Sequence, residues 1–248
     1  MNAFIQQLPA TARVLDVGSS TGSFDAGTTE ARVFRVDLEA RGAGNFANAD
    51  AAALPFADNM FDVVIANHSL EHFKQLEASI REIGRVVKSD GSLIVTVPDA
   101  TTLADRLYRW LGRGGGHVNA FTTEDQLRAQ IAAVTKLRPT GTTLLHSGYT
   151  FLNRHGLARV QKKLLLLGGG SETLLRYFSF AARLCDKHLN TRLSVYGWAY
   201  YFGAYTPPDE PPRPNVCIRC GAGHAVESLA TRRYRCAHCG AVNIRTTV

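Results

Sequence analysis

The chain has 248 residues, a mass of 27.0 kDa and a formal net charge of +7. With 45% hydrophobic and 20% charged residues, its composition excludes a largely disordered, collagenous or coiled-coil protein. Residues 1–100 hold 8 Lys and Arg against 13 Asp and Glu, whereas residues 211–248 hold 6 against 1. The acidic and basic parts are expected to meet different partners, and a basic part suits phosphate, an anionic lipid surface or an acidic substrate.

No stretch of the sequence is expected to cross a membrane, because a transmembrane helix needs roughly 20 apolar residues and the apolar runs here are short. The segment Met1–Pro9 lacks the basic start and the long apolar core of a secretory signal. We therefore expect a cytoplasmic location, where the five cysteines stay reduced and metal binding is more common than disulfide formation.

The first hundred residues alternate between short apolar strands and helical segments, which is typical of a parallel, doubly wound sheet. Strands are predicted at Arg13–Val17, Val33–Asp37, Phe46–Asp50, Phe61–Ala66 and Ser92–Val97. Apolar residues at helical spacing predict a helix over Leu76–Val87, and Ser89-Asp90-Gly91 is expected to end it with a turn.

The remaining chain is predicted to hold four helices, two strands and a linker. The helices are expected over 101–111, from Thr122 to about Val134, over 153–167 and over 171–189, and the strands over 140–149 and 194–205. The proline-rich stretch 207–214 favours an extended, stiff linker. We therefore predict a main domain over 1–206, with 153–189 as a cap or lid, and a separate small module over 215–248.

The first strand leads into a loop of small residues that suits a cofactor. Asp16 is followed by Gly18-Ser19-Ser20-Thr21-Gly22, where backbone N–H groups can approach a ligand closely. Asp37 ends the second strand, where a carboxylate can accept both hydroxyls of a ribose. Taken alone, such a loop is weak evidence, because a tight turn of an α/β domain is the alternative.

A series of motifs in fixed order makes the cofactor interpretation more specific. They are Asp16–Gly22, Asp37, Asp50–Phe56, Phe61–Val64, Leu70-Glu71-His72 and Arg85–Leu93. Over residues 12–125 the chain resembles the class I S-adenosylmethionine-dependent methyltransferases of the type 11 family. The resemblance implies a Rossmann-like, doubly wound, mostly parallel seven-stranded sheet and S-adenosyl-L-methionine as the cofactor.

The resemblance also implies which residues meet the cofactor. They are Asp16, Gly18, Ser20 and Gly22 for the methionine portion, Asp37 for the ribose, Asp50 and Ala51 for the adenine, and Asn67 and His68 beside the methyl group. The chain departs from the family where Ser20 replaces a glycine and where only 14 residues separate Gly22 from Asp37. The helices that the family has between the first strands are therefore expected to be truncated or absent.

Methyl transfer from a sulfonium is an in-line displacement, in which the protein aligns the acceptor and can remove its proton. A histidine suits the role of base, and the candidates are His72, His117 and, at the end of the fourth strand, His68. His72 can instead be structural, and His117 can simply order the helix that follows it. A good nucleophile needs no base at all.

Four cysteines near the C-terminus have the spacing of a zinc ribbon. Cys217 and Cys220 form one C-x₂-C pair, Cys236 and Cys239 form another, and 15 residues separate the pairs. Four thiolates close a tetrahedral site, so a structural Zn²⁺ is predicted, with four unligated thiols as the alternative. Gly221 and Gly240 directly follow the two pairs and permit tight turns.

Basic residues outside the first hundred leave three partner types open. The arginines of the ribbon can contact RNA or form a solvated face: Arg219, Arg232, Arg233, Arg235 and Arg245. The basic helices of 153–189 can touch an anionic membrane surface peripherally, or cover the sheet and shape an acceptor pocket.

The sequence thus predicts methyl transfer to an oxygen or nitrogen of a small-molecule or glycan-linked acceptor. One alternative is an RNA methyltransferase that uses the ribbon to bind RNA. Another is a non-catalytic cofactor-binding scaffold, against which the intact acidic and glycine positions argue.

Overall fold

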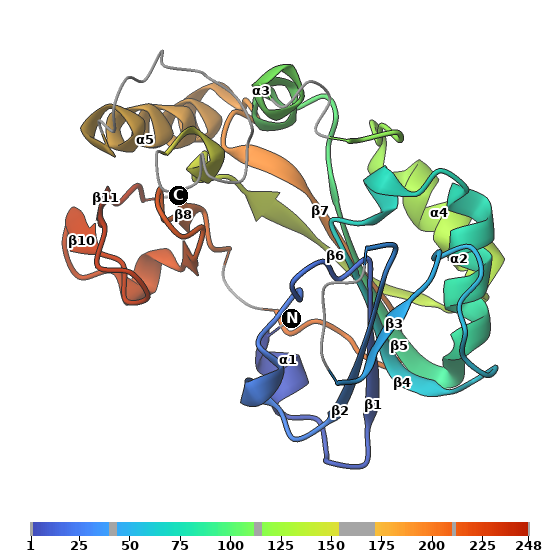
Figure 1. The fold of residues 1–248 in the computed structure, drawn as a ribbon. Helices are drawn as coiled ribbons and strands as arrows, with labels where there is room; N and C mark the ends of the chain where they lie inside the picture. Colours follow the sequence, from blue (N-terminus) through green and yellow to red (C-terminus); the bar gives the residue numbers. More distant parts are fainter. Residues whose placement is uncertain (1, 40–43, 112–115, 154–171, 210–211, 248) are drawn as a thin grey trace. The chain divides into compact units, whose positions relative to one another are not determined.

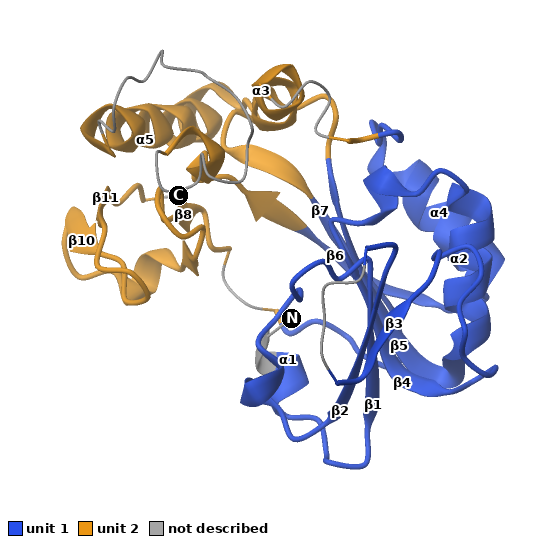
Figure 2. Cartoon of the chain, viewed as in Figure 1, with its two compact units in different colours: residues 1–98, 118–143, 198–208 blue, residues 99–117, 144–197, 209–248 orange. Residues whose placement is uncertain are grey.

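The computed structural model describes residues 2–39, 44–111, 116–153, 172–209 and 212–247. The chain forms two compact units, which Figure 2 shows in different colours. The first comprises residues 1–98, 118–143 and 198–208, and the second comprises residues 99–117, 144–197 and 209–248. Each unit has an apolar core of its own.

Seven strands of the described chain form one sheet in the order β3-β2-β1-β4-β5-β7-β6 (Figure 1). They are β1 (Arg13–Val17), β2 (Arg32–Asp37), β3 (Phe46–Asn48), β4 (Phe61–Asn67), β5 (Val87–Pro98), β6 (Pro139–His146) and β7 (Val195–Gly203). Pairing is parallel from β3 through β5. Hydrogen bonds from Asp99 N to Tyr196 O and from Ala204 N to Gly91 O make β7 antiparallel to β5. The predicted Rossmann-like, mostly parallel sheet is confirmed.

The central strands β1, β4 and β5 are apolar over most of their length because both of their faces are buried. Leu15, Val64 and Leu93, one from each strand, are at most 1% exposed. At the carboxyl ends of these strands the apolar run gives way to polar residues such as Asn67, which is half-buried. In open parallel sheets, ligands bind beyond this end of the strands.

β5 begins earlier than the sequence predicts. Helix α2 ends at Val86, and the extended Val87 pairs directly with Phe61 of β4. Gly91 lies inside the strand, where a Cβ atom would come within 3.0 Å of the carbonyl oxygens of Asp62 and Lys88. The prediction of a turn at Ser89-Asp90-Gly91 is therefore wrong, because the glycine permits a close backbone approach instead.

The connection between β1 and β2 is short, as expected from the spacing. Its described residues form only a 3-10 helix, Ala26–Thr28, which Asp25 caps by accepting a 2.9 Å hydrogen bond from Gly27 N. The predicted truncation of the helix after the first strand is confirmed. Part of the next connection, residues 40–43, lies outside the described ranges.

Helices α2 (Leu76–Val86) and α4 (Glu124–Thr135) pack against each other in the first unit. Gly84 permits this contact, since a Cβ atom there would lie 2.9 Å from the Cα of Thr135. The short helix α1 (Asn2–Gln6) has no counterpart in the sequence prediction.

The second unit contains α3 (Leu103–Leu111), α5 (Glu172–Leu189) and the short C-terminal strands β8 (Asn215–Val216), β9 (Gly223–His224), β10 (Arg233–Arg235) and β11 (Val242–Ile244). The helix expected over 153–167 falls almost wholly outside the described residues. In the ranges that are described, no helix is long and apolar enough to cross a membrane.

The C-terminal strands pack on α5. Ile218 joins Leu175 and Ala182 in one apolar cluster, and Arg176 Nε donates a 2.7 Å hydrogen bond to the carbonyl of Val242. One boundary between the compact units falls inside the predicted linker, between Pro208 and Asp209, but the C-terminal module shares its unit with residues 99–117 and 144–197 because it buries apolar side chains on α5.

Candidate functional site

The loop after β1 is held by backbone contacts to the end of β2. Gly18 N and Ser19 N donate to the carbonyl of Val36 at 2.8 and 3.2 Å, and Ser20 N donates to Asp37 Oδ2 at 2.7 Å. Gly18 has a φ of +66°, and a Cβ atom there would lie 2.5 Å from the Cβ of Ser69. Contact with Ser69 therefore leaves no room for a side chain at Gly18.

Asp16 lies fully buried beneath this loop. Its carboxylate accepts hydrogen bonds from Ser23 N at 2.8 Å and from Ser23 Oγ at 2.6 Å. Burial raises the pKa of Asp16 above its ordinary value, although the hydrogen bonds from Ser23 work in the opposite direction. A buried carboxylate of this kind is suited to hold a cationic group of a ligand.

Arg35 is the residue of this region that the sequence interpretation missed. It lies opposite Asp16 in the register of β1 and β2, and its Nε is 3.9 Å from Asp16 Oδ2. The Nη2 atom of Arg35 donates a hydrogen bond to the carbonyl of Phe24 at 3.0 Å. The same atom lies 2.5 Å from the position of an ideal Cβ on Gly22, so it occupies the space that a side chain there would need. No local pattern in the sequence indicates this contact, because it depends on the register in which β1 and β2 pair.

The two other predicted cofactor carboxylates differ in exposure. Asp37 is half-buried, and it accepts from Ser20 N through Oδ2 and from Glu39 N through Oδ1 at 3.1 Å. Each carboxylate oxygen has a further lone pair for a hydroxyl donor. Asp50 is exposed and accepts from Ala52 N at 2.9 Å, while Ala51 beside it is 7% exposed.

The end of β4 carries a second group of polar side chains. His68 has a φ of +51°. Its backbone N–H donates to both the carbonyl oxygen and the Oγ1 of Thr96, each at 3.0 Å. Thr96 Oγ1 in turn donates to Asn67 Oδ1 at 2.7 Å. His68 Nδ1 lies 3.6 Å from Oε1 of Glu71, which is 1% exposed. A non-glycine residue in the left-handed region costs energy, and such residues cluster at functional sites.

Three buried polar atoms at the ends of β1 and β4 have no hydrogen-bond partner within the described residues. They are Ser19 Oγ, Ser69 Oγ and Glu71 Oε2. Buried polar groups are normally paired, so such atoms call for a ligand or a water molecule. The buried acid, the tight glycine and these atoms together fit a polar ligand in the cradle around residues 16–23.

The two predicted catalytic histidines have different surroundings. His72 is exposed at the end of the 3-10 helix Leu70–His72. His117 belongs to the second unit, where its side chain is 5% exposed and its Nδ1 lies 3.6 Å from Asp105 Oδ1. The ring of Tyr108 lies 5.4 Å from the ring of His117. His117 therefore has the carboxylate neighbour that orients many basic histidines.

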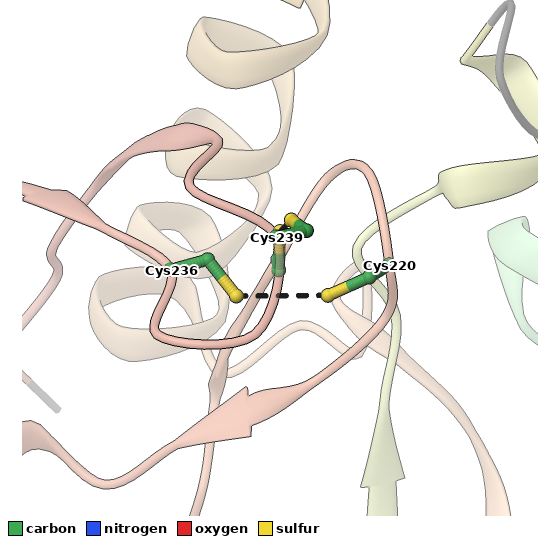
Figure 3. A group of neighbouring side chains, drawn as sticks. Cys220, Cys236 and Cys239 are labelled. Atoms are coloured by element: carbon green, nitrogen blue, oxygen red, sulfur yellow. Dashed lines mark hydrogen bonds between the residues drawn. The ribbon is translucent and has the colours of Figure 1, made fainter.

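The four predicted metal ligands come together. All four sulfur atoms lie within 4.8 Å of one another. The sulfur atoms of Cys217 and Cys239 are 3.6 Å apart, as are those of Cys220 and Cys236, which Figure 3 joins by a dashed line. A tetrahedral zinc with Zn–S bonds of about 2.3 Å needs sulfur atoms about 3.8 Å apart. The donor set and its spacing fit a structural Zn²⁺.

The backbone around the four sulfurs repeats the same turn twice. Gly221 and Gly240 have φ values of +79° and +69°, and their N–H groups donate to the carbonyls of Cys217 and Cys236 at 3.0 and 2.8 Å. The predicted glycine turns are confirmed. Although burial acts to raise it, the pKa of Cys217 is lowered because the N–H groups of Cys220 and Arg219 point at its sulfur.

Most arginines of the C-terminal module contact groups of this chain. Arg219 pairs with both carboxylate oxygens of Glu172 at 2.7 and 2.9 Å. Arg233 and Arg235 donate to the hydroxyl of Tyr177 and to the carbonyl of Gly240, each at 3.3 Å. These three side chains therefore contribute to the structure of the second unit.

The chain is similar in sequence to known methyltransferases. The family described as "Methyltransferase domain" matches residues 15–95. A malonyl-[acyl-carrier protein] O-methyltransferase of Methylococcus capsulatus is 31% identical over 212 residues, which cover 76% of this chain and 72% of the relative. A demethylmenaquinone methyltransferase of Renibacterium salmoninarum is 35% identical over 94 residues, covering 34% of this chain and 40% of the relative.

Solved structures share the fold at low sequence identity. A methyltransferase from an antibiotic biosynthesis pathway of Anabaena variabilis, described as putative, matches with a TM-score of 0.55 and 19% identity, over 81% of this chain and 95% of the other. The [4+2]-cyclase SpnF also matches with a TM-score of 0.55, at 20% identity over 83% of this chain and 79% of the other. Since one of these is a cyclase, the fold alone does not determine the reaction.

Proposed function

Since the chain belongs to the class I S-adenosylmethionine-dependent methyltransferases, we propose that it transfers a methyl group to an oxygen or nitrogen of a small-molecule or glycan-linked acceptor. The observation that carries the assignment is the cradle of residues 16–23, with its buried carboxylate, tight glycine and unpaired hydroxyl. A small acceptor is supported by the relatives, which are named for malonyl-[acyl-carrier protein] and demethylmenaquinone.

The residues of the first unit have distinct proposed roles toward S-adenosylmethionine. Asp16 and the loop Gly18–Gly22 hold the ammonium and carboxylate of the methionine portion, because they combine a buried anion with backbone N–H donors. Asp37 accepts the ribose hydroxyls, and Asp50 with Ala51 meets the adenine. Arg35 keeps the cradle in shape by holding the carbonyl of Phe24.

When bound, S-adenosylmethionine supplies a methyl group that its sulfonium has already activated. The chain then has to position the acceptor in line and, for a weakly acidic acceptor, remove a proton. Asn67 and His68 border the place of transfer in this proposal, and Glu71 orients the His68 ring. His117, beside Asp105, and His72 remain the proposed bases.

The C-terminal cysteines are proposed to hold one structural Zn²⁺. Cys217 and Cys236 are at most 2% exposed, whereas Cys220 is exposed and Cys239 is half-buried, so the metal would lie at the edge of the module. Four thiolates leave no open position for a substrate, which fits a stabilising and not a catalytic role.

RNA as the methyl acceptor is the less supported alternative. Arg219, Arg233 and Arg235 are engaged with Glu172, Tyr177 and Gly240, so fewer arginines of the module are available for phosphates. Two other arginines of the module, Arg232 and Arg245, line a cavity beside α5.

The experiment is cofactor binding by calorimetry on the full chain, followed by labelled methyl transfer to fractions of a cell extract. We expect Asp37→Ala to weaken binding by about 1–3 kcal/mol through lost charge-assisted hydrogen bonds. Asp90→Ala removes an exposed carboxylate of the same unit and should leave binding unchanged. Absence of binding to the unmodified chain would refute the assignment, and equal effects of the two variants would refute the role of Asp37.

A further inference from the structure

The second unit contains a cavity of about 310 Å³ between α5 and the C-terminal strands. Among its lining residues are Phe180, Leu184 and Lys187 from α5, and Arg232, Arg245 and Thr247 from the C-terminal module. Binding sites for small molecules typically have volumes of about 300–1,000 Å³. The cavity is therefore large enough for a small ligand or for one end of a longer one.

The charged groups that line this cavity are all basic. Lys187 Nζ donates to the carbonyl of Thr247 at 2.5 Å, Arg245 donates to the carbonyl of Leu229, and the Arg232 guanidinium lies 5.6 Å from the centre of the Phe180 ring. Within the described ranges, none of the three forms an ion pair. His188 adds a fourth group that can carry a positive charge.

The buried guanidinium of Arg183 contacts one of the residues that line the cavity. Arg183 is 2% exposed, and its Nε donates at 3.1 Å to the hydroxyl of Thr246, which also lines the cavity. Its Nη2 donates to the carbonyl of Ile244 at 2.9 Å, and its Nη1 has no partner among the described residues. Burial lowers the pKa of Arg183 to about 10.

We propose that this cavity binds the phosphate group of a ligand whose apolar portion lies against Phe180 and Leu184. The described residues that line the cavity include several cations and no carboxylate. Converging cations repel one another, and a bound dianion would remove this repulsion. Arg and Lys side chains form strong charge-assisted hydrogen bonds to phosphate oxygens. The cavity also has apolar lining residues, Phe180 and Leu184, and Leu184 is 40% exposed. These apolar side chains distinguish the site from a solvated basic surface.

The geometry favours one phosphate group over the backbone of a nucleic acid. The cavity is small, and the neighbouring Arg233 and Arg235 donate to Tyr177 and Gly240. A nucleic acid would need a continuous track of available cations along its phosphates.

Calorimetry on the full chain tests the proposal with octyl phosphate, inorganic phosphate and the uncharged octyl glucoside. Octyl phosphate should bind more tightly than inorganic phosphate, and octyl glucoside should not bind measurably. We expect Arg232→Gln and Lys187→Gln each to weaken binding of octyl phosphate about tenfold. Both side chains are exposed, so the variants should fold. Arg235→Gln, an equal charge change outside the cavity, should leave binding unchanged.

Flotation with vesicles that contain phosphatidic acid distinguishes the two sources of such a phosphate. Flotation that Arg232→Gln abolishes would identify a lipid headgroup, whereas binding of octyl phosphate without flotation would identify a soluble phosphate ester. The proposal is overturned if octyl phosphate and octyl glucoside bind alike, or if Arg235→Gln weakens binding as much as Arg232→Gln. Tight, salt-sensitive binding of an RNA oligonucleotide that depends on Arg235 would overturn it in favour of a nucleic-acid surface.

Discussion

Replacing Gly22 by alanine tests whether the shape of the loop determines cofactor binding. Gly22 has a φ of +111°, outside the regions that residues with a side chain normally adopt. A Cβ atom at this position would also lie 2.5 Å from Arg35 Nη2 and 2.8 Å from Arg35 Cζ. The substitution therefore strains the backbone and displaces the guanidinium that holds the carbonyl of Phe24.

The expected magnitude follows from these two effects. Backbone strain of this kind costs about 1–3 kcal/mol, which corresponds to a Tm lower by roughly 2–12 °C in a chain of this size. If the displaced Arg35 also loses its hydrogen bond to Phe24, the loop shifts and one contact to the ligand is lost. Loss of one hydrogen bond to a charged group weakens binding about tenfold or more.

The assay is thermal unfolding combined with calorimetric titration of S-adenosylmethionine. Gly44→Ala is the matched control, because Gly44 also has a positive φ, +79°, but no atom of the described residues lies within 4 Å of its ideal Cβ. We expect both variants to lower the Tm and only Gly22→Ala to weaken binding. If the two variants bind the cofactor equally well, the role assigned to the Gly22–Arg35 contact is wrong.

Three further predictions concern charge, metal and packing. Because burial raises the pKa of Asp16, its contribution to stability is complete below the ordinary pKa and is lost as the pH rises through the raised one. The difference in Tm between Asp16→Asn and the unmodified chain should thus shift in favour of the variant between about pH 4 and pH 7. The variant should also bind the cofactor more weakly. A difference in Tm that stays constant with pH would contradict the buried charge. Elemental analysis should find one zinc per chain. Cys236→Ser should lower this zinc content, whereas Cys185→Ser, which lies outside the cluster, should not. A chain that contains no zinc as purified would exclude the site. A chain that ends at Tyr205 loses the residues that pack on α5. It should therefore bind an apolar dye and unfold at a lower temperature, but still bind the cofactor. An unchanged Tm would show that the packing of the module on α5 contributes little to stability.

The sequence by itself determined the strands of the sheet, the loop of small residues after β1 and the cysteine cluster. Each depends on a local pattern: apolar runs predict buried strands, small residues after Asp16 permit a close backbone approach, and C-x₂-C pairs bring two thiols to one turn. The short spacing between Gly22 and Asp37 also indicated correctly that the intervening helix is reduced.

Only the tertiary structure decided which distant residues meet. Arg35 lies beneath Gly22 because β1 and β2 pair in one register, and no local pattern specifies that register. The sequence also assigned Gly91 to a turn, although long-range contact with Asp62 places it inside β5. The C-terminal module packs on α5, and the basic cavity combines residues from both, because burial of apolar area acts between segments far apart in the chain.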